Sequence, residues 1–301
     1  MKRTGKITAA LLAAAVAAVG CSKDNTSNTQ NQEPQRTARA LPVSLPTTSA
    51  NKVIDNPALA LTGAASFADG EAAFQAGKYV EARQIFEKYS QDKPNNPWGH
   101  YMLGLSESRG GDSKKAETAF EEALRLDPDH MKSLLNLSRM WIENGRFDDA
   151  IVKLTRAEEV DPKSAEVHRL LGRAYNGLHK NDEAINAYRL AMTLDPKDAW
   201  SMNNLGLILL KQEKFDEAAT LFAKAVELRK DVPTFHNNLG MALEHTGQFS
   251  AAASEYKGAL TADPGHEKAQ RNLSRVEAVK ESVKPAEDVK QPVTVSATAP
   301  Q

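Results

Sequence analysis

A 34-residue pattern recurs six times without a gap between residues 63 and 266, and it constrains the fold of this 301-residue chain more than any other feature. A fixed period of this length is typical of proteins built as a stack of repeated units rather than around one core. We number the positions of each unit from 1 to 34. The units are 63–96, 97–130, 131–164, 165–198, 199–232 and 233–266.

Each unit is predicted to be a pair of helices. Apolar residues recur at helical spacing on both sides of a polar break near position 15. Position 8 is glycine or serine, and position 20 is alanine in all six units. Small residues let two helices approach closely, and larger side chains there would cost about 1–3 kcal/mol through overpacking. Proline at position 32 of five units ends the second helix, because it lacks an amide proton and restricts the residue before it.

Position 24 completes the pattern with a large apolar side chain. The residues there are Phe86, Phe120, Leu154, Tyr188, Phe222 and Tyr256. Together these slots resemble the tetratricopeptide repeat, most closely at Leu171, Gly172, Tyr175, Ala184, Tyr188, Ala191 and Pro196, and at Leu205, Gly206, Ala218, Phe222 and Ala225. The resemblance implies an all-α fold, a right-handed α-solenoid of six helix-turn-helix units. Unit one carries Asp69 where the other five carry leucine, as suits a terminal cap.

Three segments flank the repeats. Residues 21–62 are rich in Asn, Thr, Ser, Gln and Pro, and we expect a flexible tether. Residues 267–282 are charged, with Ala269, Leu273 and Val276 on one stripe, and they are predicted to form a C-terminal capping helix. Residues 283–301, rich in Pro, Val, Thr and Ala, are predicted to be a disordered tail.

The N-terminus has the features of an export signal. Lys2, Arg3 and Lys6 precede an apolar stretch, residues 7–19, that is too short to span a membrane. Residues 18–21, Ala-Val-Gly-Cys, resemble the lipobox of bacterial lipoproteins, in which the signal is removed before a cysteine that receives lipid. The resemblance implies a signal peptide at 1–20 and lipid attachment at Cys21, the only cysteine of the chain.

The alternative is an ordinary secretory signal followed by an incidental cysteine. By family analogy, Ser22 after the cysteine favours sorting to the outer membrane. We therefore expect an exported protein, lipid-anchored in the outer membrane and facing the periplasm.

Composition and motifs argue against several classes of function. Without the first twenty residues, which hold three basic residues, 35 basic side chains face 39 acidic ones, a formal charge of -4. Nucleic acid is therefore not the expected partner, because phosphate contacts need a basic surface. His100, His168 and His236 all fall at position 4 and are predicted to be structural. The sequence has no catalytic, metal-binding or phosphate-binding motif, so we expect no enzyme, no cofactor, no metal and no small-molecule substrate.

By resemblance, the first helix of each unit lines a concave binding face, at positions 2, 5, 6, 9, 12 and 13. Asn136, Asn204 and Asn238 lie at position 6, and Asn203 and Asn237 at position 5. They resemble the asparagine ladder of peptide-binding grooves, in which the amide donates to and accepts from a peptide backbone. The alternative is that asparagine is simply a common solvated residue at these positions.

Positive charge and aromatic residues accompany the asparagines. Lys132, Arg139, Arg169 and Arg173 are predicted to attract an acidic segment, since arginine suits bidentate contact with carboxylates. Glu143 and Glu166 lie nearby, and internal neutralisation by them is the alternative. Trp98, Tyr101 and Trp200 are expected as exposed aromatics on the same face, where they would act as binding hot spots.

The expected function is that of a lipid-anchored periplasmic adaptor. Its groove would hold a peptide segment or protein partner, and the membrane would be contacted through the lipid. By resemblance, such lipoproteins aid the assembly of envelope complexes. The alternatives are a self-assembling structural scaffold without a peptide ligand and an accessory subunit of an envelope enzyme.

Overall fold

The computed structural model describes residues 66–283, which form thirteen helices. The first helices of the units are α1 (Phe67–Gln75), α3 (Pro97–Gly110), α5 (Met131–Glu143), α7 (Ala165–Gly177), α9 (Ala199–Lys211) and α11 (Pro233–His245). The second helices are α2 (Tyr79–Asp92), α4 (Ser113–Leu126), α6 (Phe147–Val160), α8 (Asn181–Leu194), α10 (Phe215–Leu228) and α12 (Phe249–Ala262), and α13 (Glu267–Val283) follows. The signal peptide, Cys21, the tether and the tail beyond residue 283 lie outside the described residues.

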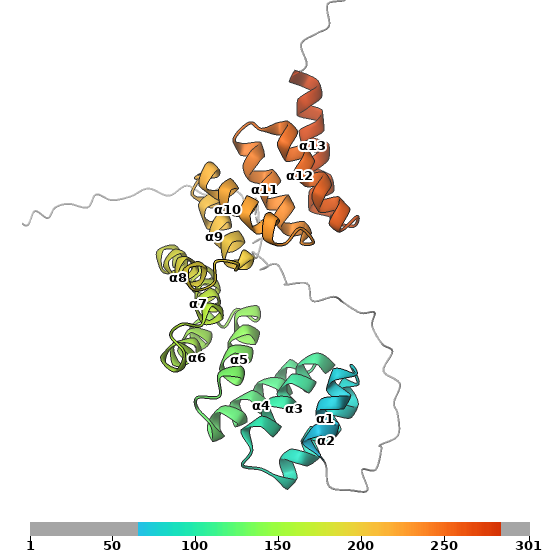
Figure 1. Ribbon diagram of the computed structural model, residues 1–301, viewed down its shortest axis with the longest axis vertical. Coiled ribbons are helices and arrows are strands. Elements are labelled where there is room, and N and C mark those ends of the chain that lie inside the picture. The colour runs from blue at the N-terminus through green and yellow to red at the C-terminus, as the bar shows by residue number, and fades with distance from the viewer. Residues whose placement is uncertain (1–65, 284–301) are drawn as a thin grey trace, which may run out of the picture. The chain divides into compact units, whose positions relative to one another are not determined.

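The helices stack in two layers, as Figure 1 shows. Each helix packs against the next one in the chain. First helices of successive units also contact one another, α1 with α3, α5 with α7, α7 with α9, α9 with α11 and α11 with α13. Lys132 of α5 lies over the Trp98 ring of α3. The all-α repeat solenoid predicted from the sequence is confirmed. Within the described helices, none is long and apolar enough to cross a membrane.

The small residues at position 8 have the predicted role. A Cβ atom on Gly104 would lie 2.7 Å from the Phe120 ring, and one on Gly172 would lie 2.6 Å from the Tyr188 ring. Any side chain there would displace the ring at position 24 of the same unit. Unit three carries Ser138 instead of glycine, and its partner at position 24 is the smaller Leu154, so the larger residue fits.

The position-4 histidines are structural, as predicted, and the structure shows how they act. His100 Nε2 donates to the Pro94 carbonyl oxygen at 3.0 Å, and His168 does the same to the carbonyl of Pro162. Each bond joins position 4 to position 32 of the preceding unit. The described residues contain no cluster of His, Cys, Asp or Glu that could hold a metal ion.

Helix α13 is the first helix of an incomplete seventh unit. Its Gln270 stands at position 4 and donates to the Pro264 carbonyl oxygen at 2.9 Å, as the histidines do in earlier units. Ala269 and Val276 are fully buried against α12. The cap therefore continues the chemistry of the repeat instead of ending it with a different packing.

Candidate functional site

The candidate site is the helix A face, which we define as positions 2, 5, 6, 9, 12 and 13 of the first helices. Its asparagines form hydrogen bonds with one another between units. Asn238 Nδ2 donates to Asn203 Oδ1 at 2.8 Å, and Asn272 Nδ2 donates to Asn237 Oδ1 at 3.0 Å. Asn203, Asn237 and Asn238 are each no more than 4% exposed. The expectation that these three amides are open to a peptide backbone is wrong, because they hydrogen-bond one another between units.

The asparagine bonds follow one rule of spacing. Each joins position 5 of a unit to position 6 of the next, 35 residues away. The same slots hold Tyr101 and Asn136, which also hydrogen-bond each other. Leu135 and Leu170 occupy the two slots between units three and four, and both belong to the apolar core. We call each of these pairs a rung. Neighbouring units are thus joined by polar rungs in some places and apolar rungs in others.

Asn204 and Asn136 are only partly buried but are also used within the fold. Asn204 hydrogen-bonds the Tyr188 hydroxyl, and burial raises the pKa of that hydroxyl far above its usual value. Asn136 Nδ2 donates to the Lys132 carbonyl oxygen at 2.8 Å. Asn136 Oδ1 accepts from Arg139 Nη1 at 2.9 Å. All five predicted asparagines therefore have partners inside the protein.

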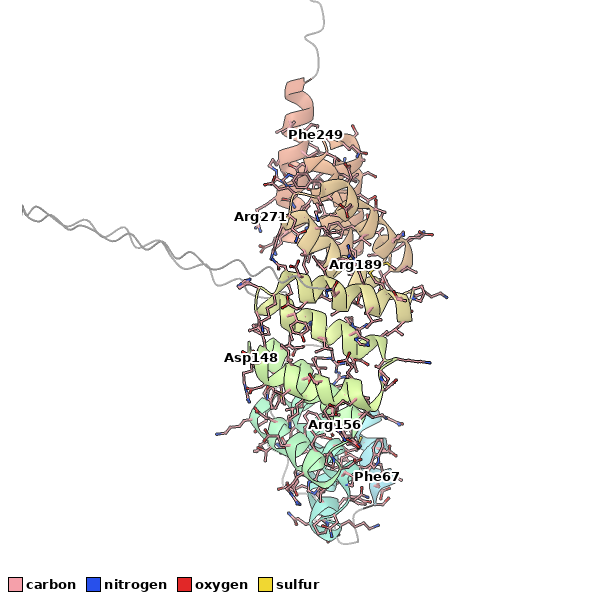
Figure 2. All side chains as sticks on the ribbon, turned by 90° about the vertical axis from the view of Figure 1, so that its left-hand side faces the viewer. Phe67, Asp148, Arg156, Arg189, Phe249 and Arg271 are labelled. Atoms are coloured by element: carbon pink, nitrogen blue, oxygen red, sulfur yellow. The ribbon has the colours of Figure 1, made fainter. Side chains whose placement is uncertain are left out.

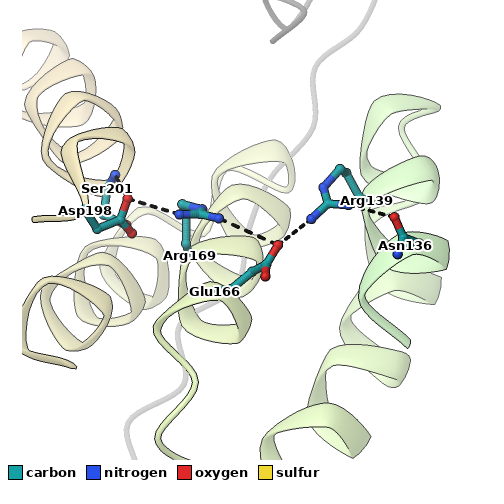
Figure 3. A network of polar contacts seen from close by, with 6 residues as sticks. All are labelled: Asn136, Arg139, Glu166, Arg169, Asp198 and Ser201. Atoms are coloured by element: carbon teal, nitrogen blue, oxygen red, sulfur yellow. Dashed lines mark hydrogen bonds and ion pairs between the residues drawn. The ribbon is translucent and has the colours of Figure 1, made fainter. Parts of the chain in front are cut away.

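Two of the predicted arginines lie in a charge network that crosses three units, drawn in Figure 3. Arg139 forms an ion pair with Glu166, which also lies 3.7 Å from Arg169. Arg169 Nη1 lies 3.2 Å from Asp198 Oδ1. The alternative in which Glu166 neutralises this charge is confirmed for Arg139 and Arg169.

Asp198 is a member of this network that the sequence did not reveal. Its side chain is only 1% exposed. Besides contacting Arg169, it caps α9 by accepting from the Ser201 backbone amide at 3.2 Å and from the Ser201 hydroxyl at 2.6 Å. A buried carboxylate needs such donors. Its place at position 34, the residue before a first helix, was the available signal, because helix N-caps favour aspartate.

Arg173 differs from the other two arginines. Within residues 66–283 it has neither a hydrogen bond nor an ion pair, although Glu143 and Tyr188 act on it electrostatically. Partial burial lowers the pKa of its guanidinium below the usual value, and the neighbouring Arg139 and Arg169 lower it further. Arginine nonetheless stays charged in proteins. Arg173 is thus a partly desolvated cation on the helix A face that forms no ion pair within the described residues, with Glu143 acting on it only at longer range.

The three predicted aromatics have different environments. Trp98 is 43% exposed, as expected, and Lys132 Nζ lies 5.0 Å from the centre of its ring. Tyr101 is only 7% exposed, so the expectation of an exposed side chain is wrong. Its hydroxyl is used in the rung with Asn136. Trp200 is half-buried, with its ring 4.9 Å from that of Phe235 in the next unit.

His130 lies beneath Trp98 and is buried. Its Nδ1 accepts from the Ser133 backbone amide at 3.3 Å and thereby caps α5. The ring proton is therefore on Nε2, which has no hydrogen-bond partner in the described structure. Burial lowers the pKa of His130, consistent with a neutral ring that packs edge-on against Trp98 and at a tilt against Tyr101.

Comparison with known proteins identifies the family. A family model for the C-terminal domain of cilia and flagella-associated protein 70, a tetratricopeptide-repeat domain, matches residues 36–299. The chain belongs to this family. Tetratricopeptide-repeat proteins generally mediate protein–protein interactions and are generally not enzymes.

Solved tetratricopeptide-repeat structures share the fold. MamA from Desulfovibrio magneticus RS-1 has a TM-score of 0.51 at 25% identity, over 54% of this chain and 91% of that one. Pseudomonas aeruginosa pilF has a TM-score of 0.61 at 17% identity, over 69% of this chain and 95% of that one. This second likeness concerns the fold alone.

Two curated relatives match over parts of the chain. The peroxisomal targeting signal receptor of Komagataella phaffii is 30% identical over 103 residues, 33% of this chain and 18% of the receptor. Cellulose synthase operon protein C of Xanthomonas axonopodis pv. citri is 35% identical over 80 residues, 27% of this chain and 5% of that protein. The chain therefore spans less than a fifth of the curated relatives that it matches.

Proposed function

We propose that this tetratricopeptide-repeat protein is a lipid-anchored adaptor of the bacterial cell envelope that binds an acidic segment of a partner protein on its helix A face. The observation that carries the binding proposal is Arg173, whose charge has no ion-pair partner among the described residues. A carboxylate from a partner would supply the opposite charge and restore hydrogen bonds that partial burial has removed. Arginine is suited to this contact because its planar fork binds carboxylates with two hydrogen bonds.

The surroundings of Arg173 favour a partner over internal pairing. Glu166, the one acid on α7, is engaged by Arg139 and Arg169. Glu143 acts on Arg173 electrostatically but forms no ion pair with it. Asp198 is satisfied by Arg169 and Ser201. Trp98 adds an exposed aromatic side chain to the same face, and aromatic residues are enriched where binding energy is concentrated.

The relatives support peptide recognition as the class of function. One of them is named a receptor for a targeting signal, and it matches this chain over 103 residues. The proposed lipid anchor rests on the sequence around Cys21. A lipid at that residue would hold the repeats at a membrane surface, within reach of other envelope proteins.

Crosslinking in intact cells, followed by mass spectrometry, tests the binding role. The wild-type chain is compared with Arg173→Gln and with Arg189→Gln. Arg189 extends from α8 and is labelled in Figure 2, so its replacement removes one cation from a second helix instead of the helix A face. We expect partners that are lost with Arg173→Gln and kept with Arg189→Gln. An unchanged set of partners with Arg173→Gln would contradict the proposed role of the helix A face.

The anchor has its own test. Cells are labelled with a clickable fatty acid, and the protein is isolated from wild-type and Cys21→Ala strains. We expect label in the wild-type protein and its loss with Cys21→Ala. Equal labelling of the two proteins would contradict lipid attachment at Cys21, and no label in either would favour an ordinary secretory signal.

A further inference from the structure

Position 9 forms one row across the helix A face, because the same slot recurs in each first helix. From α3 to α13 the row consists of Leu105, Arg139, Arg173, Leu207, Met241 and Arg275. Two of its members are engaged within the protein. Arg139 is paired with Glu166 and Asn136. Arg275 binds Glu244 with two hydrogen bonds, of 2.8 and 2.7 Å.

Between these engaged arginines, three consecutive members of the row remain available. Arg173 forms neither an ion pair nor a hydrogen bond within the described residues, and Glu143 acts on it only at longer range. Leu207 and Met241 are partly exposed, while their inner sides pack against the core clusters around α9 and α12. The available row therefore reads cation, apolar, apolar over α7, α9 and α11. Methionine adapts its shape readily to an apolar ligand.

The spacing of the row limits the conformation of a bound segment. Helix α9 contacts both α7 and α11. Packed helices have axes about 8–10 Å apart. A polyproline II segment rises about 3.1 Å per residue with three residues per turn, so every third side chain points the same way at about 9 Å intervals. A β-strand repeats its direction every two residues, at about 6.6 Å, and does not match this spacing. An α-helix matches it only at every seventh residue, at about 10.5 Å.

On the basis that the helix A face binds a partner, we propose that its ligand is a polyproline II segment with one acidic residue and with apolar residues three and six positions after it. The acidic side chain binds Arg173, and the two apolar side chains lie on Leu207 and Met241. Charge complementarity selects the acid at one end of the segment. The clasp between Arg275 and Glu244 ends the row at the other.

Fluorescence polarisation with labelled peptides and the full-length protein in detergent micelles tests this proposal. The first peptide has glutamate, leucine and methionine at its first, fourth and seventh positions in a background of proline and serine. The second has the same composition with the two apolar residues at positions three and five. The third has them at positions eight and fifteen of a helix-forming alanine background. A fourth replaces glutamate by glutamine in the first peptide.

We expect the first peptide to bind best. The fourth should bind at least about tenfold more weakly, the loss typical of one charge-assisted hydrogen bond. The second and third should also bind more weakly, because their apolar side chains do not reach Leu207 and Met241 together. Leu207→Ser should weaken the first peptide, whereas Leu105→Ser, a matched change at the same slot of unit two, should not. Circular dichroism of both variants shows whether the helices are retained. Equal binding of the first two peptides, stronger binding of the third, or equal effects of the two serine variants would overturn the proposal.

The peptide-binding experiment and the crosslinking experiment can contradict their two proposals independently. If no peptide binds but crosslinked partners still depend on Arg173, the ligand pattern is wrong and the adaptor role stands. If crosslinked partners do not depend on Arg173, the proposed function fails whatever the peptides do.

Discussion

Replacing Asn238 by alanine tests whether the rungs hold neighbouring units together. The change removes the amide that donates to Asn203 Oδ1 at 2.8 Å. Asn203 and Asn238 are both 4% exposed, so water does not reach the oxygen that is left behind. Leaving a buried polar atom without its partner costs about 1–3 kcal/mol. We expect Asn238→Ala to lower the free energy of unfolding by this amount.

The natural leucine rung supplies the matched control. Leu135 and Leu170 occupy the same two slots between units three and four. The single change Asn238→Leu leaves Asn203 unsatisfied and should cost about as much as the alanine variant. The double change Asn203→Leu with Asn238→Leu removes both polar groups, and it should lie within about 1 kcal/mol of wild type because apolar replacement of both partners can be nearly neutral.

Urea denaturation followed by circular dichroism measures these differences. The single changes Asn203→Leu and Asn238→Leu, with the double change and wild type, form a double-mutant cycle. The expected coupling between the two sites is about 1–3 kcal/mol. If the double variant is as unstable as the sum of the two single variants, the rung is not a paired unit and the reasoning fails.

Three other predictions concern stability. At position 15, His179 and Glu213 have φ angles of 59° and 61°, where four other units have glycine, so His179→Gly and Glu213→Gly should each stabilise by about 0.5–1 kcal/mol in thermal denaturation. Burial raises the pKa of Glu107, so the folded state holds its proton more tightly than the unfolded chain and stability falls as pH rises past the usual glutamate pKa. Glu107→Gln should flatten that pH dependence and stabilise at pH 7. Arg173→Gln should leave the melting temperature unchanged or raise it. Arg169→Gln should lower it, because Asp198 would become a buried charge without its cation. Equal effects of the two variants would show that Arg173 is already paired.

The fold could be predicted from the sequence because its determinants are local and repeated. Alanine at position 20 and a small residue at position 8 have one explanation in every unit, and the close approach of Gly172 to Tyr188 shows it directly. The role of the position-4 histidines followed from the same logic. A slot that serves the same purpose six times leaves little room for misinterpretation.

The site could be predicted only in part. An asparagine at position 5 or 6 is compatible with a free amide or with a rung, and the choice depends on the residue 35 positions away. Arg169 and Arg173 are one helical turn apart, yet one is paired and the other is not, because Asp198 at the start of α9 reaches only Arg169. Such pairing depends on distances between units, which a single unit's sequence does not contain.

The continuation of the register into α13 has a consequence for how a chain of this kind can change in length. Asn203, Asn237 and their partners Asn238 and Asn272 present the same chemistry at each junction after unit five. Deleting unit six would bring Asn203 opposite Asn272 and preserve the match. Deleting unit three would bring the Tyr101 hydroxyl opposite Leu170 and leave it without its amide partner. Gain or loss of whole units by recombination is therefore tolerated near the C-terminal end and penalised in the middle of the array.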